Sequence, residues 1–240
     1  MSKQLSLSII IPVWNEEKRL PRLFSELEKL LASPGQGLLV EEVIFVNDGS
    51  TDKSAELIEP FAALRPVRLI SYQGNKGKGY AVRVGMEAFQ AEYCLIADAD
   101  VSTPFSEARK FLPDLERGVP VVIGTRKAKG AVVKIHQPFY REKMGQAFTF
   151  LARVMTGVSV SDFTCGFKFF RREVARKIAK SSFIDRWSYD AEILFLAKKF
   201  GYEIKEIPVS WSNDARTAVR LVKDAGKSLI DLIRTRIKHG

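Results

Sequence analysis

The chain has 240 residues, of which 46% are hydrophobic and 28% charged, a balance that supports one large folded domain and excludes general disorder. Two cysteines are too few for a disulfide scaffold, and no glycine or heptad period indicates a collagen-like or coiled-coil chain. The 38 Lys and Arg residues exceed the 28 Asp and Glu residues by 10, which favours an anionic partner: nucleic acid, a lipid surface or a phosphorylated small molecule.

Short apolar segments alternate with helical patterns in the first half of the chain. Strands are expected at 7–11, 43–46, 67–70, 93–97 and 119–123. Between the first two, apolar residues recur at helical spacing from Leu20 to Leu31. Because nearly continuous apolar strands are typical of parallel sheets covered on both faces, the sequence predicts an α/β fold with an open, mostly parallel twisted sheet.

The second half of the chain is less regular. It begins with a basic loop after Arg126, and its expected helices and strands lie at about 141–156, 165–170, 172–180, 189–200, 203–211 and 217–238. No linker-like segment interrupts this pattern, so we expect a single domain over residues 1–240.

Nothing in the sequence predicts membrane insertion, export or a disulfide. A transmembrane span needs about 18 nearly uncharged apolar residues, and no such stretch or signal-peptide core occurs. Cys94 and Cys165 lack metal-site spacing, and we expect both to be reduced and buried in a cytoplasmic protein. His136 and His239 are too scattered for a metal site and are expected in a loop and the tail.

Polar or flexible residues follow each of the first four expected strands. These residues occupy 12–17, 47–50, 74–79 and 98–100. Open α/β sheets bind ligands at the carboxyl ends of their strands, so the four segments are expected to form one site.

The fourth of these segments carries Asp98 and Asp100, two carboxylates one residue apart. Carboxylate oxygens are hard ligands that suit Mg²⁺ or Mn²⁺ bridging to substrate phosphates. The alternative is a helix-capping turn before Pro104. The nearby Asp48 and the glycine-rich segment favour the metal interpretation.

The third segment, 74–79, interleaves three glycines with Lys76 and Lys78. Glycine lets the backbone approach an oxyanion and lysine adds positive charge, although a flexible surface turn is the alternative. The spacing does not fit the ATPase phosphate loop, and no dinucleotide fingerprint follows the first strand. Both of those enzyme classes therefore lose their main support.

Together these segments resemble a known enzyme family. IPVWNEE (11–17), VNDGSTD (46–52) and DAD (98–100) are similar to the nucleotide-sugar motifs of family 2 glycosyltransferases of GT-A fold. NKGKG (75–79), DFTCGFK (162–168), RWSYDAE (186–192) and PVSW (208–211) resemble the dolichyl-phosphate β-glucosyltransferases, which are related to the dolichyl-phosphate mannose synthases. The resemblance extends over about 7–238. Many members carry a membrane anchor or span, which this sequence does not show.

The resemblance implies roles in donor binding. The nucleotide pocket would include Pro12, Val13, Asn15, Glu16, Asp48 and Gly49, with Asp48 accepting a hydrogen bond from the base. Asp98 would contact the ribose or sugar and Asp100 would ligate the divalent metal, so both are expected as catalytic and metal-site residues. Ser102 is a weaker candidate for a third position beside the metal.

Cations are expected around the phosphates. Lys76 and Lys78 of the glycine-rich segment are two of these cations, and Gly77 between them is expected to bind substrate as well. Arg126 and Arg141 are candidates for gripping phosphate, because the planar guanidinium matches its geometry, with simple surface charges as the alternative.

The expected mechanism is a single displacement that inverts the anomeric centre, with the metal and cations stabilising the departing diphosphate. A phosphate acceptor is already anionic and needs little help from a base, whereas a hydroxyl acceptor must lose a proton. Asp190 is the candidate base or orienting group. A structural ion pair of Asp190 with Arg186 or Lys198 is the alternative.

The pattern of the tail from about 217 to 238 predicts a basic amphipathic helix, which can lie on an anionic membrane surface. The basic and aromatic residues from 127 to 151 support this interpretation. Alternatively, the apolar side of the helix packs on the domain. Nucleic acid is disfavoured, because the expected strands are apolar rather than basic and aromatic.

The sequence therefore predicts a metal-dependent inverting glycosyltransferase, peripheral on the cytoplasmic membrane face. It would transfer glucose or a related hexose from a UDP-sugar to a polyprenyl or dolichyl phosphate. Alternatives are a GDP-mannose donor, a glycan hydroxyl acceptor, or a non-catalytic nucleotide-binding, membrane-docking protein. The sequence makes no prediction of oligomeric state.

Overall fold

The computed structural model describes residues 4–32, 37–63, 66–214 and 221–240. Across these ranges, the main sheet has seven strands in the order β3-β2-β1-β4-β7-β5-β8. The strands are β1 (Leu5–Val13), β2 (Leu38–Asp48), β3 (Val67–Tyr72), β4 (Tyr93–Ala97), β5 (Val121–Thr125), β7 (Phe167–Arg171) and β8 (Ile204–Pro208). All pairings are parallel except those of β7, which is antiparallel to β4 and β5. The prediction of a mostly parallel α/β sheet is confirmed.

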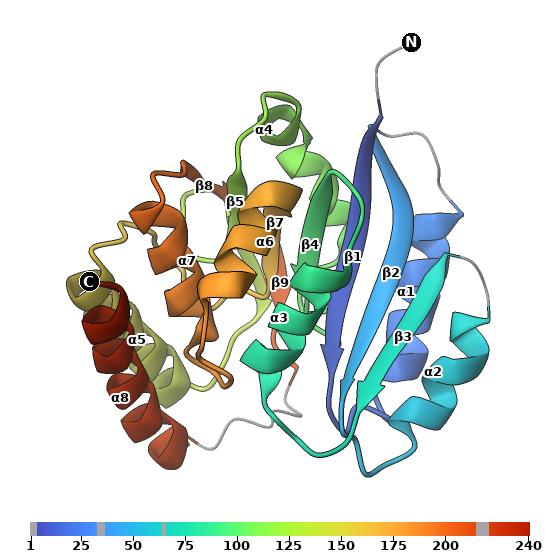
Figure 1. Cartoon of the computed structure of the whole chain (residues 1–240), viewed down its shortest axis with the longest axis horizontal. Helices are drawn as coiled ribbons and strands as arrows, with labels where there is room; N and C mark the ends of the chain where they lie inside the picture. The colour runs from blue at the N-terminus through green and yellow to red at the C-terminus, as the bar shows by residue number, and fades with distance from the viewer. Residues whose placement is uncertain (1–3, 33–36, 64–65, 215–220) are drawn as a thin grey trace.

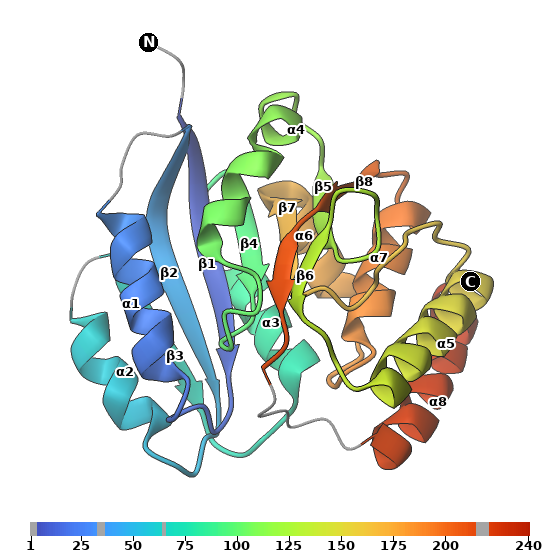
Figure 2. The same ribbon diagram turned by 180° about the vertical axis from the view of Figure 1, so that it is seen from behind.

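Helices cover both faces of this sheet (Figures 1 and 2). One face carries α1 (Leu20–Leu31), α2 (Ser54–Ala62), the 3₁₀ helix η1 (Phe105–Phe111) and α4 (Leu112–Glu116), and the other carries α3 (Lys78–Ala88), α6 (Arg172–Ser181) and α7 (Tyr189–Lys199). Ile10 of β1 packs into one apolar cluster, and its neighbours Ile9 and Ile11 pack into the other. The continuous apolar strands are therefore explained by two buried faces.

Two further helices, α5 (Phe139–Thr156) and α8 (Leu221–His239), lie side by side and pack against α7 (Figures 1 and 2). The predicted tail helix is thus present from Leu221, while 217–220 lie outside the described residues. Within the described ranges, no helix combines the length and apolar character that crossing a membrane requires.

Several boundaries differ from the expected ones. The expected strand at 203–211 is two strands, β8 in the main sheet and β9 (Ser210–Ser212), which pairs with β6 (Val132–Ile135) in a small second sheet. The change of sheet occurs at Val209, whose N–H donates to Thr125 O while its carbonyl accepts from Val132 N. The strand β6 itself lies in the segment expected to be a basic loop. Pro12, one residue beyond the strand expected at 7–11, lies within β1 opposite Val46.

The strand order also positions the functional groups. β1 lies between β2 and β4, so successive crossovers run in opposite directions from it. Such a reversal leaves a crevice outside the carboxyl ends of the strands, where open α/β folds bind their ligands.

Candidate active site

A cleft of about 1020 Å³ opens at this switch point, with α5 and α8 forming part of its wall. The predicted site residues that line it are Pro12, Val13, Glu16, Asp48, Gly77, Lys78, Asp98, Asp100, Arg126, Arg141 and Asp190. Asn15, Gly49 and Lys76 lie outside its lining. The structure therefore brings together residues from seven separate segments, as the strand-end argument expected for most of them.

Asp48 fixes the glycine-rich segment at the start of α3. Its carboxylate, 2% exposed, accepts hydrogen bonds from Lys76 N at 2.7 Å, Gly77 N at 2.8 Å and Asn75 Nδ2 at 2.8 Å. Gly49 has a φ of 63° and packs closely on Gly74. A Cβ on Gly49 would lie 2.6 Å from backbone atoms of Gly74. The resemblance assigned Asp48 to the base, but in this structure both of its oxygens hold the loop.

The two lysines of this segment point to different places. Lys76 Nζ donates to Tyr80 Oη at 3.2 Å and lies over the Tyr80 ring, away from the cleft lining. Lys78 Nζ lies 2.6 Å from Asp98 Oδ1 inside the cleft. Burial opposes the ammonium charge, but Asp98 outweighs it and raises the pKa of Lys78 well above its usual value. A permanent cation therefore faces the carboxylates.

Asp98 and Asp100 follow directly from β4. Asp98 lies against Gly166, where any Cβ would come within 2.0 Å of Asp98 Oδ2. Asp100 Oδ1 accepts from Ser102 N at 2.8 Å in a local turn, but no side chain caps the following helix η1, whose N-cap is Pro104, so the helix-capping alternative is wrong. Burial, followed by the repulsion of Asp98, raises the pKa of Asp100. The negative charge at Asp100 is therefore incompletely compensated by the protein.

These residues fit a divalent cation. Ser102 Oγ is buried on the cleft wall and has no hydrogen-bond partner among the described residues. No group of three or more His, Cys, Asp and Glu side chains forms a metal-binding cluster in the described ranges. A site with one or two carboxylates suits Mg²⁺ or Mn²⁺, which complete their shells with water and substrate phosphates.

Glu16 is joined to two cleft residues that the sequence did not single out. Arg19 Nη1 lies 2.8 Å from Glu16 Oε2, and Arg19 Nε lies 3.3 Å from Asp214 Oδ2. Burial raises the pKa of Glu16, against the opposing effect of Arg19. Because Arg19 and Asp214 are 195 residues apart, no local spacing indicates their contact.

Asn15 does not line the cleft but contacts the turn that follows β2. It has a positive φ of 55°, and its Oδ1 accepts from Thr51 N at 2.8 Å. Its own N–H donates to Ser50 Oγ at 3.0 Å. Asn15 therefore fastens the turn after β1 to the turn after β2.

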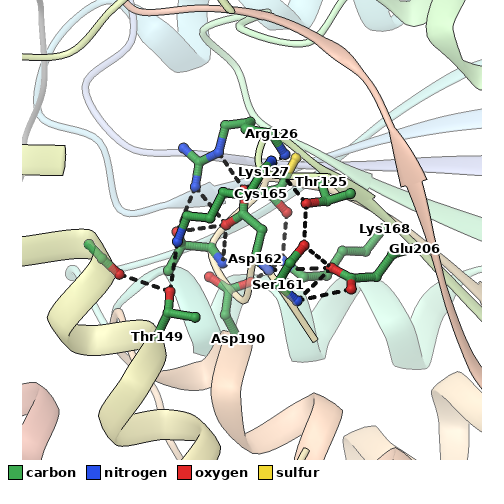
Figure 3. Close-up of polar contacts among 12 residues, drawn as sticks. Thr125, Arg126, Lys127, Thr149, Ser161, Asp162, Cys165, Lys168, Asp190 and Glu206 are labelled. Atoms are coloured by element: carbon green, nitrogen blue, oxygen red, sulfur yellow. Dashed lines mark hydrogen bonds and ion pairs between the residues drawn. The ribbon is translucent and has the colours of Figure 1, made fainter. Parts of the chain in front are cut away.

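Arg126 is held by a buried carboxylate (Figure 3). Its Nε and Nη2 lie 2.6 and 2.7 Å from the two oxygens of Asp162, which is fully buried. Burial alone would raise the pKa of Asp162, but Arg126 outweighs it and the net pKa is lowered. The guanidinium also donates to Thr164 Oγ1 at 2.8 Å. Arg126 is thus a fixed cation on the cleft wall and not a mobile surface charge.

Asp190 is paired with a lysine other than the two expected partners (Figure 3). Lys168 Nζ lies 2.5 Å from Asp190 Oδ1 and 2.6 Å from Cys165 O. The alternative pairs with Arg186 or Lys198 are wrong, because Arg186 donates to Asn75 Oδ1 and Lys198 to Gly157 O. Burial raises the pKa of Asp190, although Lys168 opposes the shift.

The segment 162–168 therefore positions three cleft residues at once. Asp162 holds Arg126, Gly166 accommodates Asp98, and Lys168 holds Asp190. Glu206 of β8 fixes the start of this segment by accepting from Ser161 N at 2.8 Å and Ser161 Oγ at 2.6 Å. The sequence resemblance included this segment but gave no role to its side chains.

Arg141 extends from α5 into the cleft and is half-buried. In the part of the chain that the structure describes, no acidic side chain is paired with it, so its donors are available to a ligand. The cleft thus combines carboxylates at the end of β4 with Lys78, Arg126 and Arg141. Such a site can bind a diphosphate with a divalent cation and, beside it, a second anion.

The mostly parallel sheet, its switch point and the carboxylate pair after β4 are the arrangement expected from the resemblance to glycosyltransferases of GT-A fold. A sequence model of the glycosyl transferase family 2 matches residues 8–179, and the chain belongs to this family. The chain is 30% identical to dolichyl-phosphate beta-glucosyltransferase of Dictyostelium discoideum, over 97% of this chain and 74% of that protein. It is 33% identical to the Drosophila melanogaster enzyme of the same name, over 88% and 68%.

A solved structure shares the fold. Glucosyl-3-phosphoglycerate synthase from Mycobacterium tuberculosis, crystallised with Mn²⁺, uridine diphosphate and glucosyl-3-phosphoglycerate, superposes with a TM-score of 0.69 at 20% identity. The match covers 98% of this chain and 80% of the other. At this identity the likeness establishes the GT-A architecture alone.

Proposed function

We propose that this glycosyltransferase transfers glucose, or a related hexose, from a UDP-sugar to a polyprenyl phosphate of the dolichyl type. The observation that carries the proposal is one cleft holding the Asp98–Asp100 pair with Lys78, Arg126 and Arg141. The names of the relatives from Dictyostelium and Drosophila support dolichyl phosphate as the acceptor and glucose as the sugar.

On the donor side, Pro12, Val13 and Glu16 would hold the nucleoside against the end of β1. Asp100 and Ser102 Oγ would hold Mg²⁺ or Mn²⁺, which supplies neutralisation of the diphosphate charge as the sugar leaves. Lys78 is paired with Asp98 and adds a fixed positive charge beside the two carboxylates Asp98 and Asp100. Asp98 would face the ribose or sugar.

On the acceptor side, Arg141 is paired with no acidic side chain among the described residues, and Arg126 is a second cation of the cleft, held by Asp162. A phosphate oxygen bound there is anionic at neutral pH, so it attacks the sugar carbon without a proton transfer to the enzyme. Lys168 occupies Oδ1 of Asp190, which leaves Oδ2 to accept a hydrogen bond from a substrate hydroxyl. We therefore assign Asp190 an orienting role, and a single displacement inverts the anomeric centre.

Because the proposed acceptor is a membrane lipid, we propose that the enzyme acts peripherally on a membrane, on its cytoplasmic face as the sequence predicts. Residues 1–240 would act as one catalytic domain, with α8 completing the cleft wall.

The test is a transfer assay with UDP-glucose and GDP-mannose, each with Mn²⁺ or Mg²⁺ and with or without a polyprenyl phosphate. We expect a glucosyl-lipid from UDP-glucose. Asp100→Ala should lower kcat by about 100-fold or more, because the metal site is lost. The matched control is Glu203→Ala, an exposed carboxylate outside the cleft, which should stay within about twofold.

Absence of product from every donor, or equal rates for the wild type and Asp100→Ala, would contradict this function. Product from GDP-mannose alone would favour the mannosyl alternative. Transfer to a glycan hydroxyl, with none to the lipid phosphate, would replace the proposed acceptor.

A further inference from the structure

The helices α5 and α8 carry most of the exposed large apolar side chains in the described residues. On α5, Phe139, Phe150 and Val154 are 72%, 66% and 65% exposed. On α8, Ile230 and Ile237 are 58% and 79% exposed. Single exposed apolar residues are normal on protein surfaces, but a group of them on adjacent elements indicates an interaction site.

The two helices that carry these side chains pack against each other and lie side by side (Figures 1 and 2). The opposite sides of the helices face the protein body: Ala152 of α5 and Leu232 of α8 are at most 1% exposed and join the core. Each helix therefore already packs one side against the protein. The exposed apolar residues are not needed for that packing. We call the outward side the α5–α8 surface.

Basic residues are interspersed with this apolar surface. By sequence the two helices contain eight Lys and Arg residues against three Asp and Glu residues, although Arg141 lines the cleft and Arg153 Nε donates to Val160 O. Of the acidic residues, Glu142 is paired with His136 and Asp231 with Arg234. Lys143 and Arg236 are both exposed. An apolar helix side bordered by Lys and Arg is the chemistry that binds anionic lipid headgroups and the acyl boundary beneath them.

The α5–α8 surface also reaches the mouth of the cleft. Leu151 of α5 and Leu229 of α8 are 39% and 43% exposed, and both line the cleft as well. A bilayer that contacts the surface would therefore lie beside the opening that leads to Arg141 and Arg126. This placement gives a lipid-linked phosphate a short path to the site.

We propose that the α5–α8 surface docks this protein on an anionic lipid bilayer. The consequence for catalysis rests on the proposed function, but the docking itself does not. A second copy of the chain fits the surface less well, because a twofold interface would bring the same basic residues face to face. Interface cores between proteins are also depleted of lysine, whereas headgroups complement it.

The test is co-sedimentation with vesicles of phosphatidylcholine alone and of phosphatidylcholine with phosphatidylserine. We expect binding to the anionic vesicles that weakens with salt, and much less binding to the neutral ones. The variant Phe150→Ser/Val154→Ser/Ile237→Ser should bind anionic vesicles about tenfold more weakly, since it removes apolar burial. Lys143→Gln/Arg236→Gln should abolish the preference for anionic lipid.

The matched control is Leu39→Ser/Leu57→Ser, which changes exposed apolar residues of β2 and α2 away from the surface. It should bind as the wild type does. No vesicle binding, equal binding to both vesicle types, or wild-type binding by the triple variant would overturn the proposal. A dimer in light scattering that dissociates in the triple variant, without vesicle binding, would assign the surface to a second copy.

Failure of docking and failure of the proposed function are separable. The three residues of the triple variant do not line the cleft, so transfer to a detergent-dispersed short-chain polyprenyl phosphate should be unchanged. Vesicle binding without any transfer would leave the docking surface in place and remove the proposed acceptor.

Discussion

At the scale of single residues, the charge of Asp190 is shared with Lys168, a lysine that is 1% exposed within an apolar strand. A buried ion pair gains little over an apolar pair, but loss of one partner leaves an uncompensated charge. The pair presents a nearly neutral group to the cleft, which is compatible with an anionic acceptor. A free carboxylate at this position would repel phosphate.

We predict that Lys168→Met lowers the free energy of unfolding by about 3–5 kcal/mol, because Asp190 loses its buried partner. Lys168→Met/Asp190→Asn should recover a large part of this loss, since neither member of the pair is then charged. Urea unfolding measures both. The control is Lys205→Met, which removes an exposed ion pair with Glu203 and should cost under about 1 kcal/mol. A Lys168→Met protein as stable as the control would contradict the prediction.

Residue types at strand ends identified Glu16, Asp48, Lys78 and the Asp98–Asp100 pair, all of which line the cleft. Asp98 and Asp100 were found because two carboxylates directly follow an apolar strand. The ion pairs that hold two arginines of the cleft were not found, since the contacts of Arg19 with Asp214 and of Arg126 with Asp162 join distant segments. Asn15 belongs to the motif at 11–17, which the sequence identified as part of the nucleotide pocket. Its side chain, however, faces the turn at Thr51.

At the scale of elements, the C-terminal end of α8 is fixed to α7 by a buried histidine. His239, expected in the tail, is 7% exposed and its Nε2 lies 2.9 Å from Glu192 Oε1. The same carboxylate accepts from Phe183 N and Ile184 N, in the segment that leads to the cleft residue Trp187. Glu192 therefore couples α8 to a loop that borders the site.

His239→Ala should lower the free energy of unfolding by about 1–3 kcal/mol, because a fully buried carboxylate loses a donor. Amide hydrogen exchange of α8 should speed up at the same time. The comparison variant is His136→Ala, whose imidazole is 70% exposed and bonds Glu142 at 3.0 Å. This variant should change stability by less than about 0.5 kcal/mol. Equal effects of the two substitutions would show that the Glu192 contact does not hold α8.

At the scale of the whole molecule, the cleft joins the sheet to the α5–α8 pair, so a bound donor should stabilise the fold. Ligand at 100 times its Kd adds about 2.7 kcal/mol. For a protein of this size we expect UDP with Mn²⁺ to raise Tm by roughly 5–10 °C. Chelation of the metal, or Asp100→Ala, should remove the Mn²⁺-dependent part, as thermal melts would show. An equal rise with UDP in chelator would argue against a metal at Asp100.

The sequence by itself determined the α/β class, the helix at 20–31, the strand at 93–97 and the gathering of polar groups at one sheet edge. These features depend on local periodicity and on the direction of parallel strands, which neighbouring residues already specify. The tertiary structure decided the antiparallel insertion of β7, the Lys168–Asp190 pair and the packing of α5 on α8. Such contacts join segments far apart in the chain, and their partners are selected by the packing of the whole fold, which no local spacing encodes.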